Sequence, residues 1–173
     1  MHLQLGHGPG CGPAMKLSTF TDYSLRMLMY LAAEPQRRAT IAEIATAFGI
    51  SEHHLGKVAQ GLGRDGWLAN VRGHGGGLAL AMAPQQIGIG QVVRRTEGAD
   101  LPAACFADDS EPCAIGAVCR LRGMLDEAVQ AFYGVLDRYT LADLARNPRT
   151  LSRLLFIDKA SAPPMSRRTE RAR

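Results

Sequence analysis

Two short helices separated by a glycine constrain the fold of this chain more than any other feature. Thr40 stands three residues before Glu43, a capping-box pair that predicts a helix over residues 41–48. Gly49 breaks this helix, and Ser51 can cap the next one, which we expect to continue up to the following glycines. Two short helices joined by such a tight turn form a helix-turn-helix unit.

A β-hairpin is expected directly after this unit. Residues 67–71 and 78–82 read as strands, and the glycine-rich segment 72–77 between them favours a tight turn. A hairpin that follows a helix-turn-helix is a wing. The glycine spacing matches neither G-x-G-x-x-G nor a Walker sequence, which disfavours a nucleotide-binding loop.

Helical periodicity predicts further helices over residues 17–33, 87–95, 119–139 and 141–146, the last of which must stop before Pro148. The longest has apolar residues in alternating steps of four and three, typical of a coiled-coil seam. These seam residues are Leu121, Leu125, Ala128, Phe132, Val135 and Tyr139. The predicted fold class is therefore mostly α: a winged helix-turn-helix with a long C-terminal dimerisation helix.

The sequence divides into five segments. Residues 1–14 are rich in glycine and proline and read as a disordered extension, and residues 158–173 read as a disordered basic tail. Between them we expect a winged helix-turn-helix DNA-binding domain at 15–97, and the dimerisation helix with a C-terminal helix at 120–157. Residues 98–119 read as a loop that holds three of the four cysteines, and this loop is the candidate cluster-binding loop considered below.

Composition narrows the class of protein. The 173 residues are 46% hydrophobic and 21% charged, which is typical of a globular chain, and the net charge of +4 favours a polyanionic partner. Apolar runs stay well short of the roughly 18 residues that cross a bilayer, so we expect a cytoplasmic protein with no membrane partner. No nucleophile and base occur at an interpretable spacing, which argues against an enzyme.

The second helix of the helix-turn-helix is the expected recognition helix. Such a helix presents its N-terminal side chains to base edges in the major groove, and an arginine at a wing tip suits the minor groove. Solvated surface residues are the alternative explanation of the same side chains. The candidate contacts to double-stranded DNA are Ser51, His53, His54 and Lys57 on this helix, with Arg72 and His74 at the hairpin tip.

Three cysteines, Cys105, Cys113 and Cys119, lie within one short segment, whereas Cys11 stands apart. Clustered thiolates suit an iron-sulfur cluster or zinc, and the start of a helix at Cys119 favours a thiolate there. The spacing follows neither zinc-finger nor ferredoxin patterns. Buried free cysteines, a redox pair and a zinc site therefore stay open as alternatives.

Four segments together resemble the NsrR group of nitric-oxide-sensing iron-sulfur repressors, in the family that also includes the cluster-assembly regulator IscR. The resemblance covers about residues 15–144. The segments are residues 15–26 (MKLSTFTDYSLR), 50–57 (ISEHHLGK), 71–78 (VRGHGGGL) and 113–125 (CAIGAVCRLRGML).

The resemblance implies a homodimer with swapped contacts along the long helix, bound to a palindromic operator. It also implies an iron-sulfur cluster, 4Fe-4S with 2Fe-2S as the alternative, on Cys105, Cys113 and Cys119. Asp22 of the partner subunit matches the position of the fourth ligand. From spacing alone, Asp22 is a carboxylate near the start of a helix with Arg26, four residues later, as its expected ion-pair partner, and the two interpretations are compatible. Nitric oxide would then be the signal that releases repression of nitric-oxide detoxification genes.

IscR-type relatives carry a histidine three residues after the last cysteine, whereas this chain has Arg122 there, which favours the NsrR group. A repressor that senses iron or cluster supply through the same ligands is the alternative within this class. A zinc-binding interaction protein without a DNA role is the alternative of another class.

Overall fold

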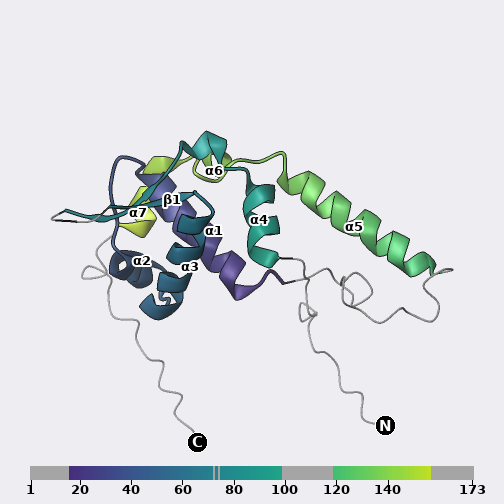
Figure 1. The fold of residues 1–173 in the computed structure, drawn as a ribbon. Helices are drawn as coiled ribbons and strands as arrows, with labels where there is room; N and C mark the ends of the chain where they lie inside the picture. Colours follow the sequence, from purple (N-terminus) through teal and green to yellow (C-terminus); the bar gives the residue numbers. More distant parts are fainter. Residues whose placement is uncertain (1–15, 72, 74, 99–118, 157–173) are drawn as a thin grey trace, which may run out of the picture.

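The computed structural model of this chain describes residues 16–71, 73, 75–98 and 119–156. The two expected disordered ends, and nearly all of the expected cluster-binding loop at 98–119, lie outside these residues. In chain order the elements are α1 (Thr19–Ala33), α2 (Ile41–Phe48), α3 (Glu52–Arg64), β1 (Leu68–Val71), β2 (Gly77–Leu80), the 3₁₀ turn η1 (Pro84–Gln86), α4 (Ile89–Glu97), α5 (Arg120–Leu136), α6 (Leu141–Leu144) and α7 (Pro148–Leu155) (Figure 1).

Local capping defines the helix-turn-helix as the sequence predicts. Thr40 and Glu43 form a complete capping box at the start of α2, and Gly49 ends α2 in the left-handed region with φ of 66°. Ser51 is the N-cap of α3, and its hydroxyl accepts a hydrogen bond from the backbone N–H of His54 at 3.4 Å. Each of these caps forms hydrogen bonds with backbone groups that would otherwise be unpaired at the end of a helix.

The hairpin that follows makes the fold a winged helix, which confirms the predicted fold class. β1 pairs antiparallel with β2, and Val71 lies opposite Gly77. A third segment joins the hairpin at its base, because Ala39 and Leu78 exchange two backbone hydrogen bonds of 3.0 and 2.8 Å. The wing is thereby attached to the chain segment that enters α2.

The hydrophobic core lies where α1, α2, α3 and α4 meet, with α1 running through the centre of the domain (Figure 1). Leu28, Ile44, Leu55, Leu62 and Val92 are fully buried, one or more from each of these helices. Burying a side chain of this size contributes about 1.5–3 kcal/mol. The core therefore holds the inner face of the recognition helix α3 against α1 and α2.

A backbone bridge between Gly88 and Thr140 moves the start of α4 and the end of α5 away from the positions that the sequence predicts. The Ile89 N–H donates to the Tyr139 carbonyl at 2.9 Å, and the Leu141 N–H donates to the Ile87 carbonyl at 2.8 Å. Because these residues pair with one another, α4 begins two residues later than expected. For the same reason α5 ends three residues before Tyr139, so the last residue of the predicted seam lies outside the helix.

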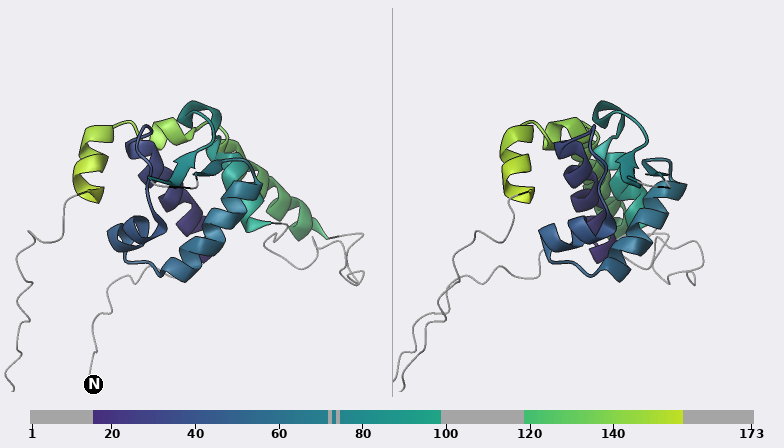
Figure 2. Two further views of the ribbon diagram at one scale, coloured as in Figure 1. Left: turned by 60° about the vertical axis from the view of Figure 1, so that its left-hand side comes forward. Right: turned by 90° about the vertical axis from the view of Figure 1, so that its left-hand side faces the viewer.

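The C-terminal helix α7 was not predicted, and α6 stops two residues earlier than the helix expected there. Pro148 is also the first residue of α7. Proline is tolerated there because the N–H groups of the first helical turn have no partner within the helix, so the missing N–H of proline breaks no hydrogen bond. The Ser152 hydroxyl donates to the Glu34 carboxylate at 2.6 Å, and the Phe156 ring meets the Tyr30 ring edge-on at 4.8 Å. α7 therefore packs alongside α1 (Figure 2).

Helix α5 projects from the domain as an arm, with its C-terminal end beside α4 and its N-terminal end far from the body (Figure 1). No side chain of α5, which the structure describes in full, is buried. None of the described helices combines the length and the apolarity that a membrane crossing requires.

Candidate functional site

One face of α3 is exposed along its whole length. His53, Lys57, Gln60 and Arg64 follow one another at steps of four, three and four, so they share a face of a helix with about 3.6 residues per turn. All of them are exposed, whereas Leu55 on the inner face is fully buried. This outer face offers two cations and two hydrogen-bonding side chains to a ligand.

His54 lies on a different side of α3 from His53. Its ring is 6.3 Å from the ring of Tyr23 on α1. Gly61 is on the same side, and a Cβ there would come within 2.8 Å of the Phe20 ring, also on α1. The structure thus places His54, although exposed, beside α1 and not along the outer face.

A groove of about 510 Å³ runs between α3 and the hairpin. Gly56 and Gly63 form part of its wall, and Gln60, Arg64 and Asn70 supply hydrogen-bond donors along it. The sequence prediction named none of these three. The spacing from Lys57 could have indicated the first two, because they continue its face of the helix, whereas Asn70 joins them only through the packing of β1 against α3.

The wing tip is described in part, since Arg72 and His74 lie outside the described residues. Gly73 and Gly75 at the tip have φ of 101° and 78°, which L side chains rarely adopt, so glycine is required for this turn. The Arg38 guanidinium donates to the Gly75 carbonyl at 3.2 Å. The position of the tip is therefore tied to the loop between α1 and α2.

Asp22 lies in the first turn of α1 and forms the ion pair with Arg26 that the sequence predicts, at 3.0 Å. Both side chains are 44% exposed, so the carboxylate keeps a face open to a second partner. The Arg26 guanidinium also lies over the Phe48 ring of α2, 5.9 Å from its centre. Asp22 is thus connected through Arg26 to the helix-turn-helix.

Cys119 is the N-cap of α5, is half-buried, and makes no capping hydrogen bond with its thiol. The thiol therefore stands at the positive end of the α5 helix dipole. The other two predicted ligands, Cys105 and Cys113, lie outside the described residues. Among the residues that are described, no group of three histidines, cysteines or carboxylates is placed to hold a metal ion.

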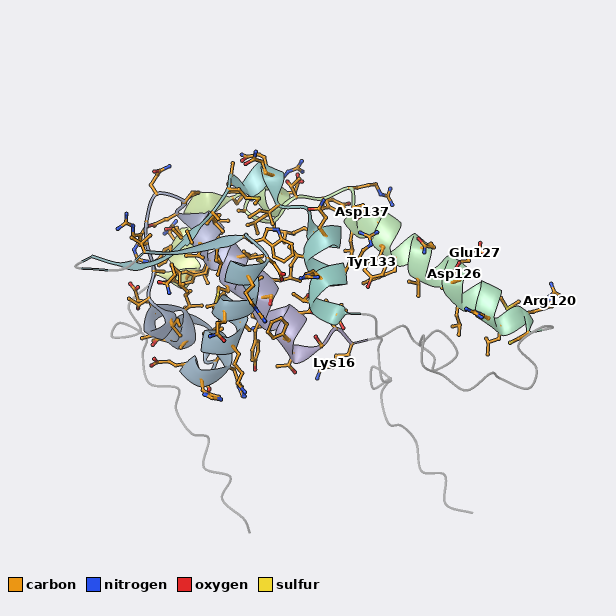
Figure 3. The ribbon with its side chains drawn as sticks, viewed as in Figure 1. Lys16, Arg120, Asp126, Glu127, Tyr133 and Asp137 are labelled. Carbon is orange, nitrogen blue, oxygen red and sulfur yellow. The ribbon has the colours of Figure 1, made fainter. Side chains whose placement is uncertain are left out.

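The two described members of the predicted ligand set are far apart within one chain. Arg120, which follows Cys119, lies at the far end of the arm, whereas Lys16, just before α1, lies beside the domain body (Figure 3). Asp22 follows in the first turn of α1. Within one chain, the start of α1 therefore does not lie next to the start of α5.

The arm carries an apolar face without a partner in the single chain. Leu121 and Met124 are each 59% exposed and Val135 is 45% exposed, although all three are apolar. Leu125 and Phe132, on the same side, are only partly buried. Exposed apolar stripes of this kind mark surfaces for association.

Comparison with known proteins identifies the class. The chain matches the Rrf2 family, described as iron-dependent transcriptional regulators, over residues 17–147. It is 46% identical over 142 residues to the HTH-type transcriptional regulator NsrR of Bacillus subtilis strain 168, covering 82% of this chain and 97% of the relative. The NsrR of Geobacillus kaustophilus strain HTA426 is also 46% identical over 142 residues, with the same coverage.

Solved structures agree with this result. The structure of CymR, the global cysteine regulator of B. subtilis, is 31% identical, covers 76% of this chain and 97% of its own, and superposes with a TM-score of 0.55. An IscR from T. potens has the same fold at 23% identity, with a TM-score of 0.62 over 87% of this chain and 93% of its own. These relatives are regulators and not enzymes, as the sequence predicts. The chain is a winged-helix transcriptional regulator and belongs to the Rrf2 family.

Proposed function

We propose that the chain acts in the cytoplasm as a homodimeric repressor whose binding to a palindromic operator is controlled by an iron-sulfur cluster, with nitric oxide as the signal. The observation that carries this proposal is the 46% identity to NsrR proteins over nearly their whole length. The three-cysteine segment and the exposed carboxylate of Asp22 supply ligands of the right chemistry.

DNA would be read by the outer face of α3 and by the wing. His53 and Lys57 lie where a recognition helix meets base edges and phosphates, and Arg72 and His74 stand in sequence at the wing tip. Ser51 already accepts the His54 N–H, so we expect it to position the helix start as well as to face the DNA.

The groove between α3 and the hairpin extends this surface. When a helix lies in the major groove and a wing reaches the adjacent minor groove, one sugar-phosphate strand passes between them. Gln60, Arg64 and Asn70 line that path and can donate to phosphate oxygens. We add them to the predicted DNA contacts.

Dimerisation would use the apolar face of α5. Two arms packed along the seam from Leu121 to Val135 would cover side chains that are about half exposed in the single chain. A two-fold axis through the arms would relate the two recognition helices by the same symmetry as a palindromic operator, whose half-sites lie about 34–36 Å apart, one turn of DNA.

The described residues fit a cluster shared across this dimer. Cys119 presents a thiol at the start of α5, with Cys105 and Cys113 in the preceding segment of the sequence, and Asp22 of the partner subunit would add a carboxylate. When bound, the cluster supplies iron with which nitric oxide can react. Arg26 holds the carboxylate in one orientation and is placed to pair with it whenever it is not a ligand.

A change at Asp22 has short paths to both helices of the DNA-binding unit. Arg26 connects it to the Phe48 ring at the end of α2. The neighbouring residue, Tyr23, lies beside His54 on α3. Release of the Asp22 carboxylate from the cluster would therefore reach the recognition helix through these two contacts of α1 with α2 and α3.

Anaerobic purification followed by iron and sulfide analysis, and by nitric oxide titration of absorbance and operator binding, tests the proposal. Serine variants of Cys105, Cys113 and Cys119 should lose iron, whereas the matched control Cys11→Ser should keep it. Colourless protein, bound zinc, or operator binding that ignores nitric oxide would contradict the proposal.

Asp22 is tested separately. Asp22→Ala should bind operator with an altered response to nitric oxide, whereas Asp126→Ala, which removes an exposed carboxylate from the arm, should behave as wild type. Equal behaviour of the two variants would remove Asp22 from the ligand set.

The description of the family as iron-dependent favours a second candidate signal, the supply of iron or of clusters. The same ligands would serve it. Operator binding by protein with and without its cluster, each measured with and without nitric oxide, separates the two: a supply sensor responds to loss of the cluster and not to the gas.

A further inference from the structure

The last turn of α4 bonds to three other parts of the domain through four consecutive side chains. Because successive residues of a helix point about 100° apart, this turn is held on all sides. The bonds join Arg94 to Asp137 after α5, Arg95 to Asp65 after α3, Thr96 to Thr21 of α1, and Glu97 to the backbone N–H of Ser18 before α1.

The bond to the arm is bidentate. Both terminal nitrogens of Arg94 donate to the two carboxylate oxygens of Asp137 at 2.6 Å, and the guanidinium lies over the Tyr133 ring, 4.4 Å from its centre. The hydrogen bond from Arg94 lowers the pKa of the Asp137 carboxyl. A Cβ at Gly90 would lie 1.9 Å from an Asp137 oxygen, so the close approach requires glycine. Figure 3 shows Tyr133 and Asp137 at the end of α5 next to α4.

The bond to the recognition helix is at the helix's C-terminal end. Asp65 is the C-cap of α3, its side chain is only 15% exposed, and it accepts from Nε of Arg95 at 2.8 Å. Arg95 itself is 70% exposed. The pair therefore fixes the end of α3 that is opposite to its base-reading start, and so the direction in which α3 points.

We propose that Arg94 and Arg95 are positioning residues for operator binding, which together set the orientation of the recognition helix relative to the arm. The path runs from Asp137 through two adjacent residues of α4 to Asp65, and α4 lies between the arm and the rest of the domain (Figure 1). A dimer that reads two half-sites needs this angle to be constant, because its two recognition helices must meet half-sites at a fixed spacing.

The inference rests on the dimer proposed above. Arg95 makes it testable, because its side chain is 70% exposed and an exposed charge contributes little to folding stability. The variants are Asp65→Asn, Arg95→Gln and the charge exchange Asp65→Arg with Arg95→Asp. The matched control is Arg138→Gln, which removes an exposed positive charge near the end of the arm. The probes are an operator selected from random duplexes, its isolated half-site, and versions with one base pair added or removed between half-sites.

Both single variants should lose at least about fivefold in affinity for the full operator, the lower end of typical coupling between linked sites. Their affinity for the half-site should stay unchanged, and their preference for the native spacing should weaken. The melting temperature of Arg95→Gln should also stay unchanged, because the Arg95 side chain is largely exposed. The charge exchange should restore both affinity and spacing preference, and Arg138→Gln should behave as wild type.

Two results overturn the inference in different ways. If Arg95→Gln loses affinity equally for the half-site, Arg95 contacts DNA directly and does not position α3; if it keeps the wild-type spacing preference, the pair has no positioning role. A wild-type protein that sediments as a monomer, or that ignores spacing, refutes the dimer itself, so failure of the proposed function is seen before the variants are compared.

Discussion

Replacing Gly77 by alanine should damage the wing at its base. Gly77 begins β2 with φ of 152°, and a Cβ there would lie 2.9 Å from the Ala39 carbonyl oxygen and 3.3 Å from its carbon. These are backbone atoms, so neither can rotate away. The added methyl group must push the strand from Ala39, which exchanges two hydrogen bonds with Leu78.

The magnitude follows from two contributions. Backbone strain at an unfavourable φ costs about 1–3 kcal/mol, and weakening of the bridge to Ala39 costs about 1 kcal/mol more. We therefore expect Gly77→Ala to lower the free energy of unfolding by about 2–4 kcal/mol. Gly75→Ala is the matched control: Gly75 also has a positive φ, of 78°, but a Cβ there meets nothing within 4 Å, so only the strain applies.

Urea unfolding followed by tryptophan fluorescence measures the difference. Trp67 is the chain's one tryptophan, is 8% exposed, and directly precedes β1, so its emission reports on the base of the wing. Gly77→Ala should unfold at clearly lower urea than Gly75→Ala. If the two variants are equally stable, the close approach of Ala39 to Gly77 does not hold the wing, and the reasoning is wrong.

Three further predictions concern the core, the DNA interface and acid stability. Leu62→Ala should cost about 2–5 kcal/mol in urea unfolding, because this fully buried side chain of α3 leaves a cavity; a loss under 1 kcal/mol would contradict its place in the core. Lys57→Gln should weaken binding to all DNA sequences alike and reduce the salt dependence of binding by about one counterion, as expected for a phosphate contact. A loss of affinity that depends on the DNA sequence would instead show that Lys57 contacts a base. The hydrogen bond from the Thr140 backbone N–H is the main cause that lowers the pKa of the Asp143 carboxyl. The stabilisation from Asp143 is therefore present above its unfolded-state pKa of about 3.9 and is lost as the pH falls through the lowered folded-state value. When unfolding is measured at pH 7, 4 and 3, the free energy of unfolding of Asp143→Asn should fall less on acidification than that of the wild type.

Sequence reasoning succeeded where the physical cause is local. A capping box acts between Thr40 and Glu43, and Gly49 and Ser51 act on their own helices, so the helix-turn-helix could be predicted from neighbouring residues. The ion pair between Asp22 and Arg26 was predictable for the same reason, because residues four apart on a helix are neighbours.

The candidate site was predictable only in part. His53 and Lys57 follow from the position of the recognition helix, but the place of His54 beside Tyr23 depends on how α3 rotates against α1. Asn70 joins the groove through contacts between β1 and α3, which no spacing along the chain reveals.

By itself, the sequence determined the winged helix-turn-helix, the arm with its apolar seam and the presence of a thiol at the arm's start, because caps, turns and periodicity act over a few residues. The tertiary structure alone decided where α5 ends, that α7 packs on α1, and that Arg95 meets Asp65 across 30 residues of chain. Such pairings depend on how separate elements pack, and packing energy is a property of the whole core and not of any one segment.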